Sequence, residues 1–467
     1  MPQLIAENLF RDPQTTAALQ QLAHSLKQHQ GQITTIKKAD PDRQKSYAAT
    51  ISEFSQLRSG NLFYPYIGSG IGNGVFVELL DGSIKYDFII GIGVHLLGHS
   101  HPKIVEACLK TALENTVMLG HLQQNASSHE FSKLLLGAAN AKGSKLAHCF
   151  LSSTGVMADE NAIKIAFQKN HPRHRILAFE KCFMGRTLAL SQITDKPGFR
   201  EGLPLNYKID YIPFYDELRP QESTAEALAA LKKHIVRYPD QHALMAFELV
   251  QGESGFNPGS REFFTALMDE LKKNDIAILV DEVQTFGRSS QLFAFQHFGL
   301  DSYVDLVTVG KASQVCATLF TESYKPKPGL LSQTFIASAS AIAAGQVIVQ
   351  ELLSGGYFGA NGRNLRLHAH FKKKLEELAK KHPALIKGPY GIGGMVAFTP
   401  FGGDNAKVTK FVHALFQNGV MGFVAGANPT RARFLLPVGA VQEHHIDEVT
   451  TIIEQTLLAL AKEEKAA

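Results

Sequence analysis

Residues 276–281, IAILVD, and residues 306–311, LVTVGK, decide the fold of this chain. Each stretch is a short apolar run that leads to a charged residue, Asp281 in the first and Lys311 in the second. Apolar runs of this length are typical of strands that are buried on both faces of a parallel sheet. Because ligands bind beyond the carboxyl ends of such strands, we expect Asp281 and Lys311 to lie at a binding site.

A carboxylate and an amine on neighbouring strand ends suit pyridoxal phosphate (PLP). The lysine forms a Schiff base with the aldehyde of the cofactor, and the aspartate keeps the pyridine nitrogen protonated so that the ring accepts electrons. Taken singly, Asp281 also fits a helix cap and Lys311 a solvated surface lysine. The magnesium-binding strand of a P-loop ATPase is excluded, because Asp305 stands where a phosphate loop ending in Gly310-Lys311 needs glycine.

The composition of the 467 residues, with 45% hydrophobic and 19% charged residues, fits a globular protein of two or three domains. The formal charge is only +4, and no basic run is interleaved with aromatic residues, so we expect no nucleic-acid partner. No apolar window approaches the ~18 residues of a membrane span, and the N-terminus matches no secretory or transit pattern.

The four cysteines form no C-x-x-C motif, which predicts a reducing compartment, a cytoplasmic location, and no metal site. They are Cys108, Cys149, Cys182 and Cys316.

Three segments of the chain differ in pattern. Residues 1–90 begin with polar helical stretches and end in a hairpin pattern around the turn dipeptide Asp81-Gly82. Between residues 91 and 340, short apolar runs alternate with helical stretches such as 159–168 and 261–273. This alternation predicts an α/β domain with a mostly parallel sheet that is covered on both faces. Residues 341–467 combine long helical patterns with short strands, which predicts a smaller α+β domain.

Several motifs follow one another in a familiar order. The central ones are ELVQGESG at 248–255, DEVQTFGR at 281–288, and LFA at 292–294 followed by HFG at 297–299; GHSHP at 98–102 and GRTL at 185–188 flank them. Over about residues 60–455 the chain resembles the class III PLP-dependent aminotransferases, the group that contains ornithine, acetylornithine and 4-aminobutyrate aminotransferases. The resemblance implies fold type I, in which residues 91–340 form a large PLP-binding domain with a seven-stranded, mostly parallel sheet. Residues 341–467 would form the small domain, and residues 1–90 would contribute to it and to the substrate entrance.

The resemblance also implies cofactor-binding roles for individual residues. Lys311 would form the Schiff base and move protons, and Asp281 would pair with the pyridine nitrogen. Val283 and Phe183 would pack on the two faces of the ring, and Gln284 would hydrogen-bond its phenolic oxygen. Thr334 would reach the phosphate from the second subunit, which implies a homodimer with its active sites at the interface.

Three further residues are candidates for substrate binding on the same grounds. Arg433 stands where the family grips a substrate carboxylate, a task for which the planar guanidinium is well suited. Glu253 resembles the glutamate that pairs with an arginine and helps one pocket accept two substrates. Tyr64 lies in the segment that lines the substrate entrance.

The chain departs from the family at the turn that holds the phosphate. The usual Ser-Gly-Ser/Thr is replaced by Thr154-Gly155-Val156, so the hydroxyl of the third residue is lost. Backbone N–H groups at a helix start still hold a phosphate, and Thr154 can supply a hydroxyl in place of Val156. Met184 and the glycine-poor stretch after Lys311 are further departures, which put the identity of the substrate in doubt.

We therefore expect an aminotransferase that moves an amino group from an amino acid or ω-amine donor to a keto acid or aldehyde by ping-pong chemistry. Two alternatives remain open. The same electron sink serves aminomutases, decarboxylases and racemases, because the reaction depends on which substrate bond stands perpendicular to the ring. The departures at Val156 and after Lys311 also leave room for a non-catalytic PLP-binding relative.

Overall fold

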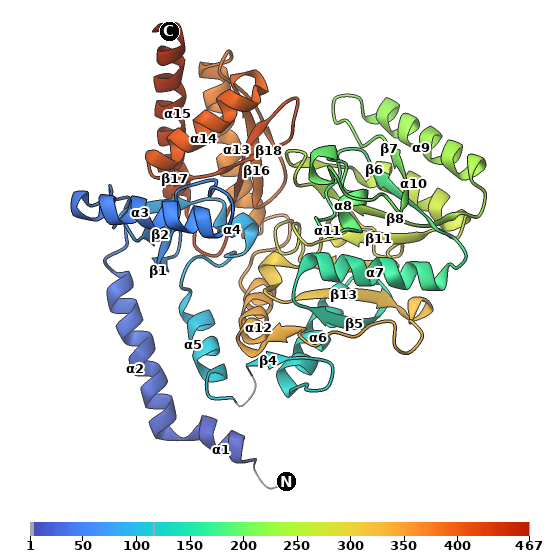
Figure 1. The fold of residues 1–467 in the computed structure, drawn as a ribbon, viewed down its shortest axis with the longest axis horizontal. Coiled ribbons are helices and arrows are strands. Elements are labelled where there is room, and N and C mark those ends of the chain that lie inside the picture. Colours follow the sequence, from blue (N-terminus) through green and yellow to red (C-terminus); the bar gives the residue numbers. More distant parts are fainter. Residues whose placement is uncertain (1–3, 115–116, 467) are drawn as a thin grey trace. The chain divides into compact units, whose positions relative to one another are not determined.

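The computed structural model describes residues 4–114 and 117–466 (Figure 1). The chain forms two compact units. The N-terminal unit comprises Met1–Asn115, Leu367–Pro389 and Val396–Ala467, and the central unit comprises Thr116–Arg366 and Tyr390–Met395. The main boundaries between these units lie after residues 115 and 366, whereas the sequence pattern predicts boundaries after residues 90 and 340. The assignment of a role to each predicted domain stays a prediction.

A seven-stranded sheet forms the core of the central unit. Its strand order is β5-β13-β12-β11-β8-β6-β7, and β13 alone in this sheet runs antiparallel to its neighbours. This arrangement confirms the predicted mostly parallel sheet of fold type I. The strands are β5 (Leu146–Ser152), β6 (Arg175–Phe179), β7 (Lys208–Ile212), β8 (His242–Glu248), β11 (Ala277–Asp281), β12 (Leu306–Val309) and β13 (Cys316–Thr321).

The central strands are buried along their whole length, as their apolar sequences require. Every residue of β8, β11 and β12 is buried. Helix α7 packs across β5, β8, β11, β12 and β13, and α10 packs on β11 and on α9. The principal helices of this unit are α6 (Ala126–Ala139), α7 (Gly155–Lys169), α9 (Pro220–Arg237), α10 (Arg261–Lys273) and α12 (Ala339–Ser354), with the short helices α8 (Leu190–Ile193) and α11 (Ala294–His297).

Two-stranded ribbons complete the central unit. Strand β4 (Met118–Leu119) pairs with β14 (Ala337–Ser338), and β9 (Val250–Gln251) pairs with β10 (Asn257–Pro258). The first ribbon brings the segment after residue 117 beside the segment that contains Thr334. The backbone carbonyl of Gln333 accepts a hydrogen bond from the His121 amide over 3.1 Å.

The N-terminal unit contains two four-stranded sheets, with strand orders β1-β2-β3-β17 and β15-β16-β19-β18. The predicted hairpin is present as the antiparallel pair β2 and β3, and Gly82 takes the positive φ of 76° that its turn requires. The strands are β1 (Gly68–Asn73), β2 (Phe76–Leu79), β3 (Ile84–Asp87), β15 (Ile386–Tyr390), β16 (Met395–Pro400), β17 (Val420–Met421), β18 (Phe423–Ala425) and β19 (Arg431–Leu435). The helices are α1 (Ile5–Arg11), α2 (Pro13–Gln30), α3 (Pro41–Leu57), α4 (Ile90–Gly93), α5 (Pro102–Thr111), most of α13 (Arg363–Lys381), α14 (Asn405–Gln417) and α15 (Glu443–Ala466).

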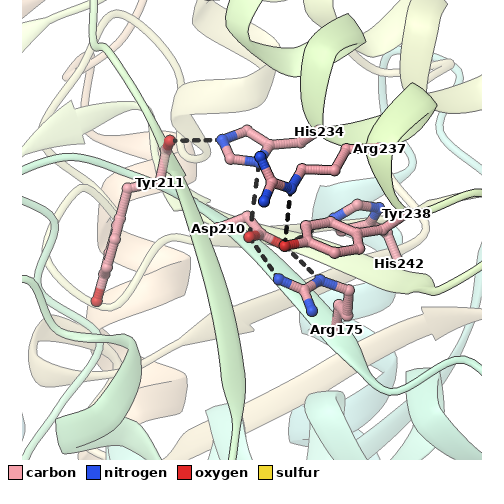
Figure 2. A network of polar contacts seen from close by, with 7 residues as sticks. All are labelled: Arg175, Asp210, Tyr211, His234, Arg237, Tyr238 and His242. Carbon is pink, nitrogen blue, oxygen red and sulfur yellow. Dashed lines mark hydrogen bonds and ion pairs between the residues drawn. The ribbon is translucent and has the colours of Figure 1, made fainter.

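A polar cluster joins the amino-terminal ends of β6 and β8 to β7 (Figure 2). The Arg175 guanidinium donates two hydrogen bonds to Asp210, over 2.6 and 2.7 Å, and His242 Nε2 lies 2.9 Å from the same carboxylate. The ring of Tyr238 covers the guanidinium at 3.5 Å, and His234 Nδ1 lies 3.5 Å from Asp210. Because Asp281 and Lys311 follow the carboxyl ends of their strands, this cluster belongs to the opposite edge of the sheet.

Among the described residues, none of the helices combines the length and the apolar character that crossing a bilayer requires.

Candidate active site

A pocket of about 240 Å³ opens in the central unit at the carboxyl edge of the sheet. It brings together the predicted residues of the cofactor site and Glu253, with the exception of Thr334. The pocket is lined by Thr154, Gly155, Val156, Asp159, Phe183, Met184, Gly185, Glu248, Glu253, Asp281, Val283, Gln284 and Lys311.

Asp281 is the last residue of β11, and its carboxylate is held in place by the chain that follows. Its Oδ1 accepts a hydrogen bond from the Val283 amide over 2.7 Å. Burial raises the pKa of Asp281 to about 6, although the Val283 amide, Lys311 and Thr308 act in the opposite direction. In the folded protein this carboxylate therefore ionises at a higher pH than the ~3.9 of a free aspartate.

Lys311 follows β12 with only Gly310 between them, and it takes a positive φ of 51°. A left-handed backbone is uncommon for a residue with a Cβ and persists where the surroundings impose it. Gly310 allows the close packing here, because a Cβ at that position would lie 3.0 Å from both Cys316 Sγ and Val283 Cγ1.

Two further buried carboxyls line the pocket, and neither is among the predicted site residues. Glu248 ends β8, and its carboxylate accepts hydrogen bonds from the amides of Phe183 and Gly252 over 3.0 and 2.9 Å. Burial, with a further contribution from Asp281, raises the pKa of Glu248 to about 8. Burial also raises the pKa of Asp159 well above its usual range. Glu248 could have been found from sequence, since it ends an apolar strand as Asp281 does.

The start of α7 supplies the part of the pocket that suits an anion. Thr154 caps the helix, and its hydroxyl accepts a hydrogen bond from the Met157 amide over 3.3 Å. The amides of a first helical turn and the helix dipole favour a phosphate there. Gly155 is needed for packing, because a Cβ at this position would lie 3.0 Å from Val283 Cγ1.

Gln284 provides the strongest sign that the pocket takes a polar ligand. Its Oε1 is buried and has no hydrogen-bond partner among the described residues. Gly252 leaves the room that this side chain occupies, since a Cβ there would lie 2.1 Å from Oε1. A buried polar atom without a partner costs free energy, so a donor on a bound molecule would stabilise it. The hydroxyl on the PLP ring is such a donor, and the residues of the pocket therefore fit PLP.

Three predicted residues lie outside this pocket. Thr334 is exposed and belongs to the segment next to β14 in the central unit. Arg433 belongs to β19 of the N-terminal unit, where its buried guanidinium lies 5.4 Å from the Phe423 ring. Tyr64 is buried in the same unit and donates a hydrogen bond to the Gly422 carbonyl over 2.7 Å. Their roles stay predictions.

Comparisons with known proteins place the chain in one family. The family model "Aminotransferase class-III" matches residues 66–457. The acetylornithine aminotransferase of Caldanaerobacter subterraneus is 28% identical over 83% of this chain and 93% of its own length. That of Methanocaldococcus jannaschii is 29% identical over 84% of this chain and 93% of its own length.

Solved structures share the fold. Lysine aminotransferase from M. tuberculosis superimposes with a TM-score of 0.77 at 23% identity, over 88% of this chain and 99% of that one. Ornithine aminotransferase from Toxoplasma gondii gives a TM-score of 0.76 at 22% identity, over 89% of this chain and 96% of that one. The chain belongs to the class III aminotransferases, and it is a PLP-dependent transaminase of fold type I.

Proposed function

We propose that the chain moves an amino group from an amino acid or ω-amine donor to a keto acid or aldehyde in two half-reactions that share one pocket. The observation that carries this proposal is the presence of Lys311, Asp281 and Gln284 around one pocket, beside the start of α7. An amine, a carboxylate and a helix start at one sheet edge supply the groups that a PLP-dependent amino transfer needs.

Each lining residue has a proposed task in holding the cofactor. Thr154 and the amides of Gly155 and Val156 bind the phosphate. Val283 and Phe183 enclose the ring, while Gln284 accepts from the ring hydroxyl. When bound, PLP supplies an aldehyde that condenses with amines and a ring that accepts electrons.

Lys311 transfers the proton, and Asp281 compensates the positive charge on the ring nitrogen. Lys311 Nζ takes the proton from the carbon that bears the donor amine, and it returns a proton to the carbonyl carbon of the acceptor. Asp281, when ionised, holds a proton on the ring nitrogen through a charge-assisted hydrogen bond. The residues around them exclude water, which strengthens this interaction.

Substrate choice is assigned to Glu253, Arg433 and Tyr64. Glu253 lines the pocket, and its carboxylate lies 3.7 Å from Lys196 Nζ, so a cation already faces it within the central unit. We propose that Arg433 grips a substrate carboxylate and that Tyr64 lines the substrate entrance. Glu253 would compensate the charge of an arginine when the second substrate lacks a distal carboxylate.

We further propose that the protein acts in the cytoplasm as a homodimer. Thr334 is exposed, and large apolar side chains are exposed on the same segments: Val117 at 74%, Leu122 at 95% and Phe335 at 59%. A group of this kind is typical of a surface that another protein covers. All four cysteines are free thiols, in keeping with a reducing compartment.

The first experiment is a visible absorption spectrum of the protein with added PLP, before and after borohydride reduction, followed by peptide mapping. We expect a band that reduction removes and a cofactor-modified peptide that contains Lys311. A screen of amino acids and ω-amines, each paired with one keto acid, then identifies the donor. Modification of another lysine would contradict the site, and an amine product that is rearranged or decarboxylated would contradict transamination.

A further inference from the structure

A lysine of the central unit lies beside one carboxylate of the pocket wall. Lys196 Nζ is 3.7 Å from Glu253 Oε2, and Glu253 lines the pocket. The two side chains are 32% and 20% exposed, so water reaches this part of the wall. The separation exceeds the roughly 2.7–3.2 Å of an N–H···O hydrogen bond. Because a long and partly exposed ion pair is weak, another carboxylate can take the place of Glu253.

The loop that carries Lys196 is held against the turn that lines the pocket. Thr194 Oγ1 accepts hydrogen bonds from the Met184 and Gly185 amides over 2.9 and 3.1 Å, and it donates to the Gly185 carbonyl over 2.9 Å. Met184 and Gly185 both line the pocket. These contacts fix where the backbone of Lys196 stands relative to the pocket, while its long side chain stays partly exposed and able to turn.

An aromatic ring links this lysine to the pocket wall. Lys196 Nζ lies 5.1 Å from the centroid of the Phe199 ring, and the Arg186 guanidinium lies 3.7 Å from it. Phe183, which lines the pocket, meets Phe199 edge to face with the ring centroids 6.4 Å apart. Since the face of an aromatic ring attracts cations, Phe199 gathers positive charge next to Phe183.

The charges that line the pocket leave a role for a further cation. Among the described residues of the lining, Lys311 is the only basic one. The acidic ones are Asp159, Glu248, Glu253 and Asp281. Under the proposed function, the Lys311 amine is committed to the cofactor aldehyde. A substrate with a second carboxylate would therefore meet like charges, which disfavour binding unless another cation compensates them. Within the central unit, Lys196 is a cation that already pairs with a lining carboxylate.

We propose that Lys196 determines substrate specificity by leaving Glu253 and binding the second carboxylate of a dicarboxylic substrate. Glu253 is the internal competitor, which holds Lys196 when the substrate has one carboxylate and releases it when a second one arrives. This inference rests on the proposed function of the pocket and names a residue that selects its substrate. Lys196 takes no part in the proton transfer, so it acts on the binding of the substrate.

The binding of two unreactive acids, measured with saturating PLP, tests this role without turnover. Glutarate and pentanoate share one carbon chain, but only glutarate has a second carboxylate. We expect Lys196→Met to raise the dissociation constant of glutarate about tenfold and to change that of pentanoate by less than about threefold. Lys196→Arg keeps the charge and is expected to keep the preference for glutarate. Equal binding of both acids by the wild type, or an unchanged preference in Lys196→Met, would overturn the proposal.

Glu253→Gln distinguishes a competitor from a structural partner. Glutamine keeps the shape of the side chain and removes the charge that holds Lys196, so we expect glutarate to bind about threefold more tightly. Weaker binding by Glu253→Gln, as for a damaged structural pair, would contradict the competition. The gain should vanish when Lys196→Met is added, because the two residues act through one contact. A gain that persists undiminished would assign the second carboxylate to another cation.

Lys181→Met is the matched control. Lys181 is exposed, its amide donates to Asp195 Oδ2 over 2.7 Å, and it does not line the pocket. The variant removes the same charge beside the same loop, and it is expected to bind both acids like the wild type. Weakening of glutarate by Lys181→Met equal to that by Lys196→Met would mean that only the general charge of this surface matters, and would overturn the proposal.

A half-reaction separates this inference from the proposed function. Protein loaded with pyridoxamine phosphate is mixed with 2-oxoglutarate, and the return of PLP is followed by absorption. For Lys196→Met we expect the half-saturating concentration to rise about tenfold with an unchanged maximal rate, since a contact that serves binding alone is lost. A lower maximal rate at unchanged half-saturation would overturn the proposal. A wild type that prefers glutarate through Lys196 but converts no keto acid would contradict the proposed function and leave the role of Lys196 in binding established.

Discussion

Asp281 lies opposite Thr308 in the parallel pairing of β11 with β12. Thr308 stands three residues before Lys311 in the sequence. The pairing fixes the carboxylate and the amine at the ends of neighbouring strands, because a parallel register aligns strand ends that are far apart in sequence. Asp281 and Lys311 are separated by 29 residues in the sequence, and the chain leaves the sheet after β11 and returns to it in β12. The pocket therefore lies at the ends of two strands in which every residue is buried.

Replacement of Lys311 by alanine removes the amine that we propose moves the proton. We expect kcat/KM for transamination to fall by about 10²–10⁴-fold, the range for loss of a general acid–base group. Borohydride would no longer attach the cofactor to the peptide that contains position 311. Lys327→Ala, at an exposed lysine of the same unit, is the control and is expected to keep full activity. Unchanged transamination by Lys311→Ala would show that another group moves the proton.

Replacement of Asp281 by asparagine removes the negative charge that we propose lies beside the ring nitrogen of PLP. A charge-assisted hydrogen bond contributes about 1.5–3 kcal/mol, so PLP affinity is expected to fall about ten- to a hundredfold. In the wild type, affinity should also decrease as the pH falls through about 6, because Asp281 becomes protonated there. Titrations of both proteins from pH 5 to 8 measure the effect, and the variant should lack this acid limb. If the PLP affinity of the variant decreased in the same way toward acid pH, the titrating group would be a residue other than Asp281.

Glu282→Gln is the control for damage to the fold at this strand end. Its carboxylate accepts hydrogen bonds from the Ala294 and Phe295 amides over 2.9 and 2.7 Å and does not line the pocket. We expect this variant to melt at a lower temperature and to keep the PLP affinity of the wild type.

Most strands and helices that carry the site are predictable from periodicity. The helix predicted at 261–273 is α10, with the same bounds, and the apolar runs at 276–280 and 306–309 are β11 and β12. Strand β13 is not predicted. The turn between Lys311 and Val315 that precedes it contains no glycine, so the sequence gives no signal that the chain reverses there. Lys311 and Gln314 take positive φ values of 51° and 62° instead, a strain that the sequence does not reveal.

Some residues of the candidate site can also be predicted from the sequence, and others cannot. Those that follow strand ends or match a motif, such as Asp281, Gln284 and Lys311, are accessible to sequence reasoning. Asp159 is not, because its place in the pocket lining depends on burial and on the contact with Thr308, which is 149 residues away. Strand β7 is missed for a related reason, since Asp210 is unusual inside a strand and is tolerated only with its partners Arg175 and His242.

Replacement of Val156 by threonine restores a hydroxyl to the predicted phosphate turn. Threonine has the shape of valine, and the close contact with Gly185, where a Cβ would lie 2.6 Å from Val156 Cγ1, is preserved. One added hydrogen bond contributes about 0.5–1.5 kcal/mol, so the affinity for PLP should rise by up to about tenfold. Equilibrium titration with PLP measures the change. Thr154→Ser keeps the existing hydroxyl and is expected to bind like the wild type, and weaker binding by Val156→Thr would exclude a phosphate at this turn.

Replacement of Asp210 by asparagine tests the polar cluster at the far edge of the sheet. Burial alone would raise the pKa of Asp210, but hydrogen bonds from His242 and Arg175 outweigh it and lower the pKa. A group whose pKa is lowered by folding stabilises the protein fully above its unfolded pKa of about 3.9, and loses this contribution as the pH falls further. We expect the variant to lose about 3–5 kcal/mol at pH 7, as for a broken buried ion pair, and less at acid pH.

Thermal unfolding from pH 7 to 3 measures this effect. Asp240→Asn serves as the control, since its carboxylate is 89% exposed and pairs with Arg173 at 3.3 Å. An exposed pair of this kind contributes only about 0–1 kcal/mol. A difference between Asp210→Asn and the wild type that grows toward acid pH would contradict the assigned direction of the pKa shift.

Mixed dimers test whether Thr334 acts on the active site of the second subunit. Lys311→Ala and Thr334→Ala are each expected to be impaired alone, but co-expression would create dimers with one intact site. Random pairing in a two-fold dimer gives about half mixed dimers, so activity should recover to about a quarter of the wild-type level. Lys311→Ala mixed with Asp281→Asn is the matched control and should show no recovery, because both residues line the same pocket of one chain. Failure of the first mixture to recover, with dimers present by sedimentation, would mean that Thr334 does not complete the partner's site.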